Sequence, residues 1–487
     1  MADWCICASD IASHAVGRLR RPARGFAWSA AALLCSGGGV AVHAEAPGAR
    51  YIPQDPLFER QWYLDNPATG ADIDAPEAWS ITRGSPDIVI AVLDDGVDAQ
   101  HPDLAGKLLA GRDFSGAEPL DGAVPRHADD RHGTAVAGIA AADGNNGLGM
   151  IGACPGCTLL PIRIDRNNAL GTAAAFRYAV EQGADIITNS WGYARAAHPD
   201  RFELVSAAIE LAAQNGRGGR GAVVVFGLTN QAVDNCADEH FDLAALPSVI
   251  AVGVADHLDS IGGSGYGDCM DLVAPAKPRY RGTLGTLTTD RRGSAGYTGG
   301  DYHESFGGTS AAAPLVAGVA GLLLSLNPQL TAAEVQRILE HSADRIDPAR
   351  AQYDASGFSP SAGYGRLNAG RAVRPIVRIR ISPAEVAVGE PFSVTVTASA
   401  PYGVERISWR NRDAGPDSTA WLHDEVDGGQ AYYERTWAGL AAPREGFYRF
   451  EARVRDAAHA LDDDYPHASE SRNDSLEGLL SVRGVSP

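Results

Sequence analysis

Ser305-Phe-Gly-Gly-Thr-Ser310-Ala-Ala-Ala-Pro-Leu-Val-Ala-Gly-Val-Ala-Gly-Leu-Leu-Leu-Ser-Leu326 places a serine after a glycine-rich turn, at the start of a strongly apolar helical segment. Gly307 and Gly308 allow the backbone to approach a neighbour closely, and the first turn of a helix has unpaired N–H groups that can stabilise an oxyanion. Ser310 is therefore a candidate nucleophile. An ordinary N-capping serine on a buried helix would give the same local pattern, so other parts of the chain must decide between the two.

The segments upstream of this serine alternate between buried strands and helices. Asp87-Ile-Val-Ile-Ala-Val-Leu-Asp94 is a continuous apolar run, which is typical of a strand covered on both faces in a parallel sheet. Further strands are expected at 157–164, 184–192, 222–226 and 248–254, with helices near 172–182 and 202–215. This alternation predicts an α/β fold with a doubly wound, mostly parallel sheet.

Two more candidate residues stand at the ends of these elements. Asp94 and Asp95 end the first strand, where α/β proteins place their sites, although a turn aspartate before Gly96 is the alternative. His132 begins a helix of small and apolar residues, where a capping or core histidine is the alternative. A nucleophilic serine needs a base that takes its proton and a carboxylate that orients the imidazole, and Asp94, His132 and Ser310 can supply the set.

Three separate motifs make the chain resemble the subtilisin-type serine proteases over about residues 51–373. They are Asp94-Asp-Gly96 through His101-Pro-Asp-Leu104, Arg131-His-Gly-Thr134, and Gly308-Thr-Ser-Ala-Ala-Ala-Pro314. The order Asp, His, Ser along the chain is that of subtilisin. Within the superfamily the chain is similar to the kexin/furin branch, because it has Asp-Asp-Gly at the first motif, Asp55-Pro-Leu-Phe with Gln61-Trp-Tyr-Leu64, and Gly216-Arg-Gly-Gly219.

The resemblance implies a role for each residue of the site. Ser310 would attack the scissile carbonyl, His132 would act as general base and then acid, and Asp94 would hold the imidazole. Asn230 stands where the family has its oxyanion-hole asparagine. The chain departs from the family here, because Gly227-Leu-Thr229 replaces the usual Ala-Ala-Gly or Ala-Ser-Gly, and the added bulk bears on where Asn230 is placed.

The resemblance also implies a buried calcium site. Carboxylates would come from Asp55 and Asp103, a side-chain oxygen from Asn146, and backbone carbonyls from Asp143, Leu148 and Met150. Oxygen ligands of this kind suit calcium. A second calcium site is expected near Asp234, Asp242 and Asp268.

Substrate preference follows less directly. Asp95 and Asp129 resemble acids that bind the residue before the last basic one, and Asp242 resembles an acid at the base of the primary pocket. Trp191-Gly192 resembles part of the cleft wall, but Tyr193-Ala-Arg195-Ala follows it instead of the family's carboxylates. Cleavage after Arg or Lys is expected. The alternatives are a broad-specificity secreted subtilisin-like protease and a catalytically inactive binding protein.

The N-terminus resembles a secretory signal peptide, with a basic segment at 18–24, an apolar run from Phe26 to Val42 and cleavage after about Ala44. A translation start nearer Val16 would give a more ordinary signal peptide. The run is glycine-rich and short, so we expect no stable membrane span. We therefore expect a secreted, periplasmic or extracellular protein. The formal net charge of −19 argues against nucleic acid as a partner and leaves polypeptide substrates as the expected ligands.

Four cysteines remain after such a signal, and an even number in an exported chain predicts two disulfides with three pairings. The resemblance implies the pair Cys236–Cys269, which favours Cys154–Cys157 as the other. A zinc site at Cys154-Pro-Gly-Cys157 is disfavoured because no second ligand pair follows at matching spacing.

Beyond about residue 375 the pattern changes to alternation with period two, as in Ile376-Val-Arg-Ile-Arg-Ile381 and Phe447-Tyr-Arg-Phe-Glu-Ala-Arg-Val454, which predicts a β-sandwich. The expected domains are 1–44, a signal peptide with an N-terminal extension; 45–373, the catalytic domain; and 374–487, an immunoglobulin-like β-sandwich. Only about ten residues separate the signal from Asp55, too few for a folding prodomain, so either a separate chaperone assists folding or the C-terminal sandwich does. We expect a monomer.

Overall fold

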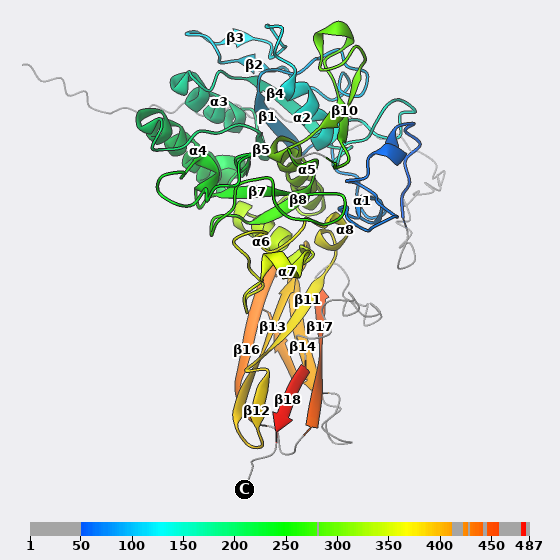
Figure 1. The fold of residues 1–487 in the computed structure, drawn as a ribbon, viewed down its shortest axis with the longest axis vertical. Helices are drawn as coiled ribbons and strands as arrows, with labels where there is room; N and C mark the ends of the chain where they lie inside the picture. Colours follow the sequence, from blue (N-terminus) through cyan, green and yellow to red (C-terminus); the bar gives the residue numbers. More distant parts are fainter. Residues whose placement is uncertain are drawn as a thin grey trace, which may run out of the picture. The chain divides into compact units, whose positions relative to one another are not determined.

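The computed structural model describes residues 50–279, 282–411, 422–426, 429–441, 446–456 and 479–483. The expected signal peptide at 1–44 lies outside these residues. The described part begins with α/β architecture and ends with antiparallel sheets, as the sequence predicts (Figure 1).

An eight-stranded sheet forms the centre of the α/β part, in the order β3-β2-β4-β1-β5-β6-β7-β8. All neighbours in it are parallel except β2 and β3. The strands are β1 (Val89–Asp94), β2 (Arg112–Asp113), β3 (Leu120–Asp121), β4 (Thr158–Arg163), β5 (Ile186–Asn189), β6 (Val223–Gly227), β7 (Val249–Ala255) and β8 (Leu272–Pro275). The predicted doubly wound, mostly parallel sheet is confirmed.

Helices cover both faces of this sheet because alternate side chains of each strand point to opposite sides. Ile90 and Val92 of β1 join one buried cluster, which includes α2 (His132–Ala141) and α5 (Thr309–Leu326). Ala91 and Leu93 join a second cluster, which includes α3 (Ala169–Glu181) and α4 (Pro199–Gly219). Between these two layers of helices, the ends of strands and the starts of helices meet at one edge of the sheet, and the site lies there.

The central helix α5 is the most apolar of these elements. Among the described residues it alone has the length and hydropathy of a membrane span, but 89% of it is buried inside the protein, which identifies it as a core helix. The predicted helix at 202–215 begins earlier, at Pro199. Its regular part ends where expected, because Gly216, Arg217 and Gly218 leave helical geometry.

Shorter elements complete the α/β part. They are η1 (Phe58–Arg60), α1 (Ala75–Trp79), η2 (Leu243–Ala245), β9 (Thr286–Thr289), η3 (Gly293–Ala295), β10 (Tyr302–Phe306), α6 (Ala332–Ser342), α7 (Pro348–Ala351) and α8 (Ala369–Ala372). The antiparallel hairpin β9–β10 leads directly into α5. The Thr288 and Thr289 hydroxyls donate to the backbone carbonyls of Ala135 and Thr134 at 2.6 and 2.7 Å, which fixes this hairpin against α2.

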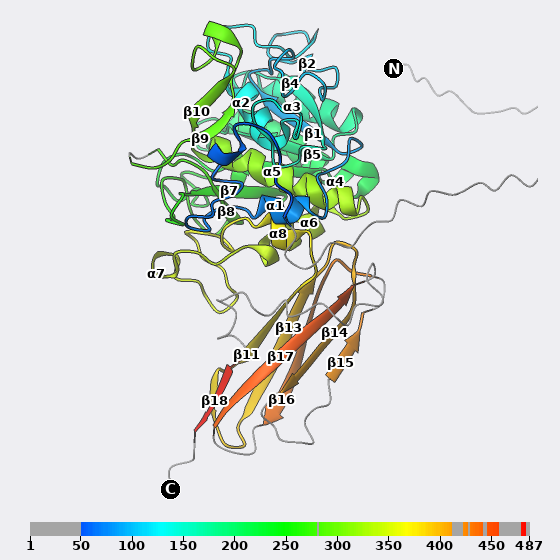
Figure 2. The same cartoon turned by 90° about the vertical axis from the view of Figure 1, so that its right-hand side faces the viewer.

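From Ile376 onward the chain forms two further sheets, whose long strands run side by side in Figure 2. One contains β11 (Ile376–Ser382), β13 (Pro391–Ser399) and β16 (Tyr432–Ala441); the other contains β12 (Glu385–Ala387), β18 (Leu479–Arg483), β17 (Gly446–Asp456), β14 (Val404–Asn411) and β15 (Leu422–Glu425). All pairs are antiparallel except β12–β18. A separate buried cluster that includes Val394, Ile407 and Trp409 gives these sheets their own core, as in a β-sandwich.

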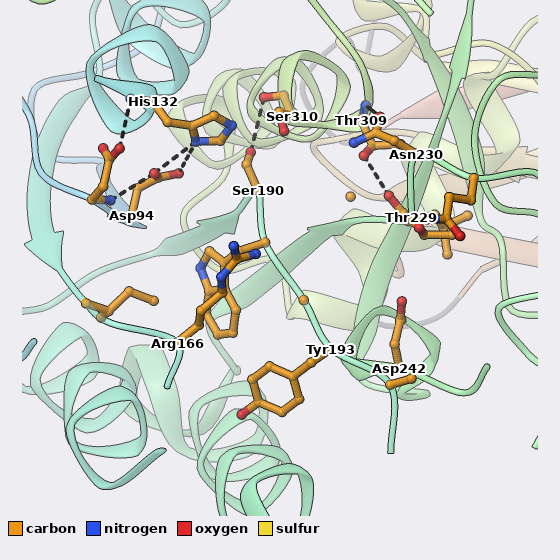
Figure 3. A pocket seen from close by; sticks show the side chains of 18 of the residues that line it. Asp94, His132, Arg166, Ser190, Tyr193, Thr229, Asn230, Asp242, Thr309 and Ser310 are labelled. Atoms are coloured by element: carbon orange, nitrogen blue, oxygen red, sulfur yellow. Dashed lines mark hydrogen bonds and ion pairs between the residues drawn. The ribbon is translucent and has the colours of Figure 1, made fainter. Parts of the chain in front are cut away.

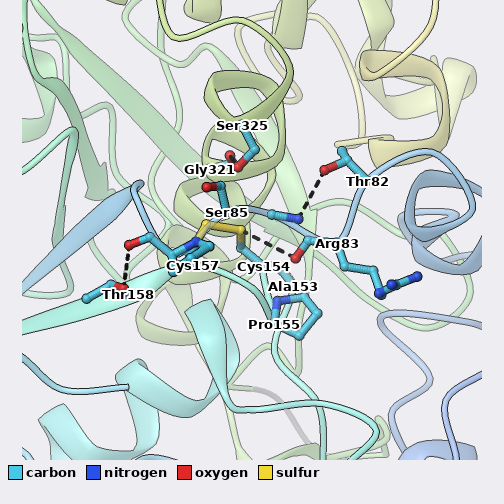
Figure 4. The surroundings of a disulfide bond; sticks show 12 residues. Thr82, Arg83, Ser85, Ala153, Cys154, Pro155, Cys157, Thr158, Gly321 and Ser325 are labelled. Atoms are coloured by element: carbon cyan, nitrogen blue, oxygen red, sulfur yellow. Dashed lines mark hydrogen bonds between the residues drawn. A yellow bond between two sulfur atoms is a disulfide. The ribbon is translucent and has the colours of Figure 1, made fainter. Parts of the chain in front are cut away.

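Both disulfides that the sequence analysis favours are present, Cys154–Cys157 and Cys236–Cys269. The first lies against α5 and the loop that contains Arg83 (Figure 4). A Cβ atom at Gly84 would stand 2.4 Å from Cys154 Sγ, and one at Gly321 would stand 2.7 Å from Cys157 Sγ. Glycine at both positions therefore makes room for the sulfur atoms, which are bonded to each other instead of to zinc.

Candidate active site

Asp94 and His132 are joined by the sheet and the helix that carry them. Asp94 ends β1 and His132 begins α2, and His132 Nδ1 lies 2.9 and 3.0 Å from the two carboxylate oxygens of Asp94 (Figure 3). Burial lowers the pKa of His132, but the charge and hydrogen bond of Asp94 raise it by more, so the net pKa lies above its ordinary value. A buried carboxylate therefore orients the imidazole and favours its protonated form.

Asp95 fixes the start of α2. Its carboxylate accepts backbone N–H bonds from Arg131 and His132, both at 3.0 Å, and from Gly133 at 2.7 Å. Burial, and then the charge of Asp94, raise the pKa of Asp95 to about 6. A Cβ at position 133 would stand 2.5 Å from the carbonyl oxygen of Gly96, so glycine is needed there for the helix to approach the strand end.

Ser310 is the second residue of α5 and lines the same cleft as Asp94 and His132. In the view of Figure 3 the three side chains follow one another in the order Asp94, His132, Ser310. The Ser190 hydroxyl donates to the backbone carbonyl of Ser310 at 3.1 Å. Phe306 of β10 lies beside the imidazole of His132, with ring centroids 5.4 Å apart. The base and the nucleophile are thus held by different elements that meet in one cleft.

Asn230 follows β6 and turns its amide toward the start of α5. Its Oδ1 accepts the backbone N–H of Thr309 at 3.0 Å, which leaves the Nδ2 end of the amide as a donor beside Ser310. Gly308 has φ +72°, and a Cβ there would stand 2.3 Å from Asn230 Oδ1. The glycine turn before Ser310 is therefore what allows Asn230 to come so close.

Leu228 does not crowd this arrangement. Its side chain is 1% exposed and belongs to the core cluster beneath α3 and α4. Its backbone carbonyl accepts the Thr309 hydroxyl at 2.6 Å, and its N–H donates to Val252 at 3.0 Å. The bulk that Leu228 adds relative to the family pattern therefore points into the core, whereas Thr229 lines the cleft beside Asn230.

The cleft has a volume of about 880 Å³. Eight of the predicted site residues line it: Asp94, Asp95, His132, Trp191, Gly192, Asn230, Asp242 and Ser310. Trp191 Nε1 donates to the backbone carbonyl of Leu93 at 2.8 Å, which fixes the indole in the cleft wall. Asp129 is exposed and does not belong to this lining, so its contact with substrate stays a prediction.

Asp242 and Arg195 face different surroundings. Asp242 lines the cleft and is buried; its carboxylate accepts from Ala244 N at 2.8 Å and from Asn235 Nδ2 at 2.6 Å, and burial raises its pKa to about 7. Arg195 does not line the cleft. Its guanidinium pairs with Asp238 at 3.2 Å and lies 4.8 Å from the ring centre of Phe241. The arginine that could have repelled a cationic substrate is therefore held elsewhere.

Arg163 is a functional neighbour that the sequence analysis did not single out. It ends β4, is 5% exposed and pairs with Asp113 at 3.2 Å and Asp130 at 2.9 Å. It also donates to the backbone carbonyl of Asp95 at 3.1 Å. The sequence could have pointed to Arg163, because an arginine in an otherwise apolar strand must find buried partners.

The expected calcium ligands include two buried carboxylates, Asp55 and Asp103. Asp55 accepts from the N–H groups of Asn145 and Asn146, at 2.6 and 3.2 Å. Asp103 accepts from Asn146 Nδ2 at 3.1 Å and from the Tyr302 hydroxyl at 2.9 Å. Burial, together with the charge of Asp103, raises the pKa of Asp55.

Among the described residues no group of three or more His, Cys, Asp or Glu side chains is arranged for a metal, and neither of these carboxylates has a basic partner. The two carboxylates fit a hard cation, because the ion would neutralise two buried negative charges. The side-chain oxygen of Asn146 does not face them as expected: it accepts from Leu148 N at 2.8 Å, so the amide would have to turn to bind the ion. Leu148 could contribute only its backbone carbonyl, because its side chain has no oxygen. The three aspartates expected for a second site, Asp234, Asp242 and Asp268, do not form a metal-binding group in the described structure.

Comparisons with known proteins agree with this geometry. The model of the subtilase family matches residues 85–365. A calcium-dependent protease of Nostoc sp. is 36% identical over 69% of this chain and 54% of its own length, so the chain spans about half of that relative. Kexin of Saccharomyces cerevisiae is 32% identical over 66% of this chain and 39% of its own length.

A solved structure extends the likeness of fold. The serine protease of Aeromonas sobria, solved with a chaperone, has a TM-score of 0.58 and 18% identity over 82% of this chain and 90% of that one. At this identity the match bears on the fold alone. Since the family model covers more than half of the residues and spans the elements that carry Asp94, His132 and Ser310, the chain belongs to the subtilase family.

Proposed function

We propose that the protein is a secreted serine endopeptidase that hydrolyses peptide bonds with Asp94, His132 and Ser310 and with Asn230 in the oxyanion hole. The observation that carries this proposal is the Asp94–His132 pair at 2.9 Å in the same cleft as Ser310 and Asn230. The membership of the subtilase family supports it.

In the acylation step His132 takes the proton of the Ser310 hydroxyl as the oxygen attacks the carbonyl carbon, and the carbonyl electron pair moves onto oxygen. Asn230 Nδ2 and the Ser310 backbone N–H, which has no partner inside the helix, would donate to that oxyanion. His132 then passes its proton to the leaving amine and the C–N bond breaks. Water repeats the sequence on the acyl-enzyme and restores Ser310.

Fluorophosphonate labelling of wild type and Ser310→Ala, followed by peptide hydrolysis, tests this function. Wild type should label and cleave, and Ser310→Ala should do neither. Ser325→Ala removes another serine of α5, whose hydroxyl donates to Gly321, and should label like wild type. A folded wild-type protein that neither labels nor cleaves would contradict the proposal and favour a binding protein.

We propose that the primary pocket accepts Arg or Lys. Support comes from Asp242 in the cleft, from Arg195 held at Asp238, and from the similarity to kexin. A bound cation would also restore the charged form of Asp242 near neutral pH, because opposite charge lowers a carboxyl pKa. In a peptide library Asp242→Asn should lose this preference. A preference of wild type for large apolar residues would instead support a broad-specificity protease.

The other predicted substrate contacts remain part of the proposal. The carboxylate of Asp95 already accepts three backbone N–H groups, so its effect on a cationic substrate would come mainly from its charge. Asp129 would need to reach the substrate from outside the cleft lining.

We propose a calcium ion held by Asp55, Asp103 and Asn146, with backbone carbonyls of Asp143, Leu148 and Met150. When bound, the ion would neutralise the two carboxylates and fix the loop at 143–150. The relative from Nostoc sp. is named a calcium-dependent protease, which supports this site.

Secretion, domain boundaries and partners are also proposals. Export would follow from a signal peptide at 1–44, and two disulfides suit an oxidising compartment. The N-terminal sequence of the exported protein should begin near Glu45.

We propose a monomer with a catalytic domain at 45–373 and a β-sandwich at 374–487. A separate folding chaperone would act as partner; full activity of residues 45–487 expressed alone would exclude that requirement.

A further inference from the structure

Arg166 lies in the loop between β4 and α3 and lines the cleft. Its side chain is exposed, and Figure 3 shows it extending into the cleft below Ser190. Its positive charge acts to lower the pKa of His132, which lines the same cleft. Because Ser310 lines this cleft as well, a substrate bound at Ser310 would lie in the same cleft as this arginine.

The aspartates that line the cleft have donors of their own. Asp94 bonds to His132, Asp95 to three backbone N–H groups, Asp130 to Arg163, Asp165 to Asn167, and Asp242 to Asn235 and Ala244. Asp130 is further neutralised by the backbone N–H groups of Arg126 and His127, at 2.8 and 2.9 Å. Of these five, only Asp94 and Asp130 have a basic side chain as partner in the described structure, and the other three accept hydrogen bonds from neutral donors.

The arginines of the cleft differ from one another in their partners. Arg163 is saturated by Asp113 and Asp130. Arg166 has no hydrogen bond or ion pair among the described residues, and a further arginine, Arg279, also lines the cleft. A free guanidinium with five donors is suited to binding a carboxylate with two parallel hydrogen bonds. Arg166 is therefore a cation of this cleft that has its donors available for a substrate carboxylate.

We propose that Arg166 selects substrates that carry an Asp or Glu side chain within four residues of the scissile bond. This inference rests on the proposed endopeptidase function and deepens it. The preferred substrate would then combine a basic residue in the primary pocket, near Asp242, with an acidic residue at the neighbouring Arg166. The substrate position that contacts Arg166 is the one at which the preference for Asp or Glu changes when Arg166 is replaced.

The test compares cleavage of a peptide library, randomised at four positions on each side of the scissile bond, by wild type, Arg166→Ala and Arg166→Glu. Wild type should prefer Asp or Glu over Asn or Gln at one position by about 2- to 5-fold in kcat/KM, the range of an exposed ion pair. Arg166→Ala should lose this preference, and Arg166→Glu should prefer Lys or Arg there. The preference should shrink as ionic strength rises.

Arg177→Glu is the matched control, because it makes the same charge change on an exposed arginine of α3 that does not line the cleft. Its profile should equal that of wild type. Thermal unfolding of all variants checks that each is folded, and fluorophosphonate titration gives the active fraction.

The possible outcomes separate the two proposals. An enzyme that labels and cleaves but has the same charge preferences in wild type and Arg166→Glu overturns this inference alone. A wild-type protein that does not label overturns the proposed function and this inference with it. A preference that reverses with the charge at position 166 supports both.

Discussion

Asn230 uses the two ends of its amide for different tasks. Its oxygen accepts from Thr309 N at 3.0 Å and so holds the turn before Ser310, whereas its nitrogen faces the cleft. Asn230→Asp keeps the acceptor, removes the donor and adds a negative charge beside the oxyanion. We expect kcat to fall by at least the factor of about 10² to 10³ that follows the loss of one oxyanion donor, with little change in KM.

Steady-state kinetics with active-site titration measures this loss. Asn230→Ala removes both ends of the amide without adding a charge, so kcat should fall about 10²- to 10³-fold, and loss of the contact with Thr309 should lower the melting temperature as well. If Asn230→Asp kept wild-type kcat, the asparagine would have only the structural role at Thr309.

The pH dependence of the reaction should show the environment of His132. Its pKa is raised above the ordinary 6.5, because Asp94 outweighs the effect of burial, while Arg166 acts in the opposite direction. A general base must be neutral, so activity should rise with pH through a midpoint above 6.5. In the kcat/KM profile, Arg166→Ala should move this midpoint to still higher pH. A midpoint at or below 6.5 in wild type would contradict the expected pairing with Asp94.

For single residues, the sequence predicts which residues form the site better than it predicts where their side chains point. Asp94, His132, Asn230 and Ser310 stand at strand ends or helix starts, and the fold brings such positions to one edge of the sheet. The sequence could not predict where Arg195 turns, because that depends on the contacts that Asp238 and Phe241 offer in three dimensions.

Among the elements, α6 carries a half-buried acid, Glu340, that makes stability depend on pH. Glu340 and Asp271 of the loop before β8 share Gln336, whose Nε2 donates to Glu340 at 3.0 Å and to Asp271 at 2.8 Å. Burial and then the charge of Asp271 raise the pKa of Glu340 to about 8. The folded state therefore holds a proton that the unfolded chain, with an ordinary value of 4.5, has lost.

Stability should consequently fall as pH rises from about 5 to 8, because the folded state binds more protons than the unfolded state in this range. Glu340→Gln mimics the protonated acid and should be more stable than wild type at pH 8 by about 1–3 kcal/mol, since one pKa unit corresponds to about 1.4 kcal/mol. Denaturant unfolding at pH 5 and pH 8 measures the difference. Glu181→Gln, at an exposed position of α3, should follow wild type. If the difference in unfolding free energy between wild type and Glu340→Gln were the same at pH 5 and pH 8, folded Glu340 would not hold a proton in this range.

Element types were predictable because apolar periodicity differs between buried strands, helices and half-buried strands. Val89–Asp94 reads as a strand covered on both faces, and Ile376–Ser382 as one covered on one face. The sequence did not predict that α4 begins at Pro199, since proline in the first turn is compatible with both a helix and a loop. Nor did it reveal that Leu228 would point into the core, because the side of the chain it faces depends on how β6 meets β7.

For the molecule as a whole, the proposed calcium ion joins segments that are far apart in the sequence. Asp55 precedes the first helix, Asp103 follows β1, and Asn146 follows α2. Each carboxylate is buried without a basic partner in the described structure, so removal of the ion would leave two like charges close together. Calcium should therefore stabilise the folded protein by mass action, by about 2.7 kcal/mol at a concentration of 100 times Kd.

Thermal unfolding with excess calcium and with a chelator measures this effect, and calorimetric titration of the chelated protein with calcium measures binding directly. Wild type should melt at a lower temperature after chelation and regain its stability when calcium returns. Asp103→Asn removes one of the two buried charges, so it should bind calcium more weakly and lose most of the response to the chelator. Asp200→Asn, which makes the same change at an exposed position on α4, should respond like wild type. Equal melting curves of wild type with calcium and with chelator, together with no heat of binding, would show that Asp55 and Asp103 are held by their N–H and hydroxyl donors alone.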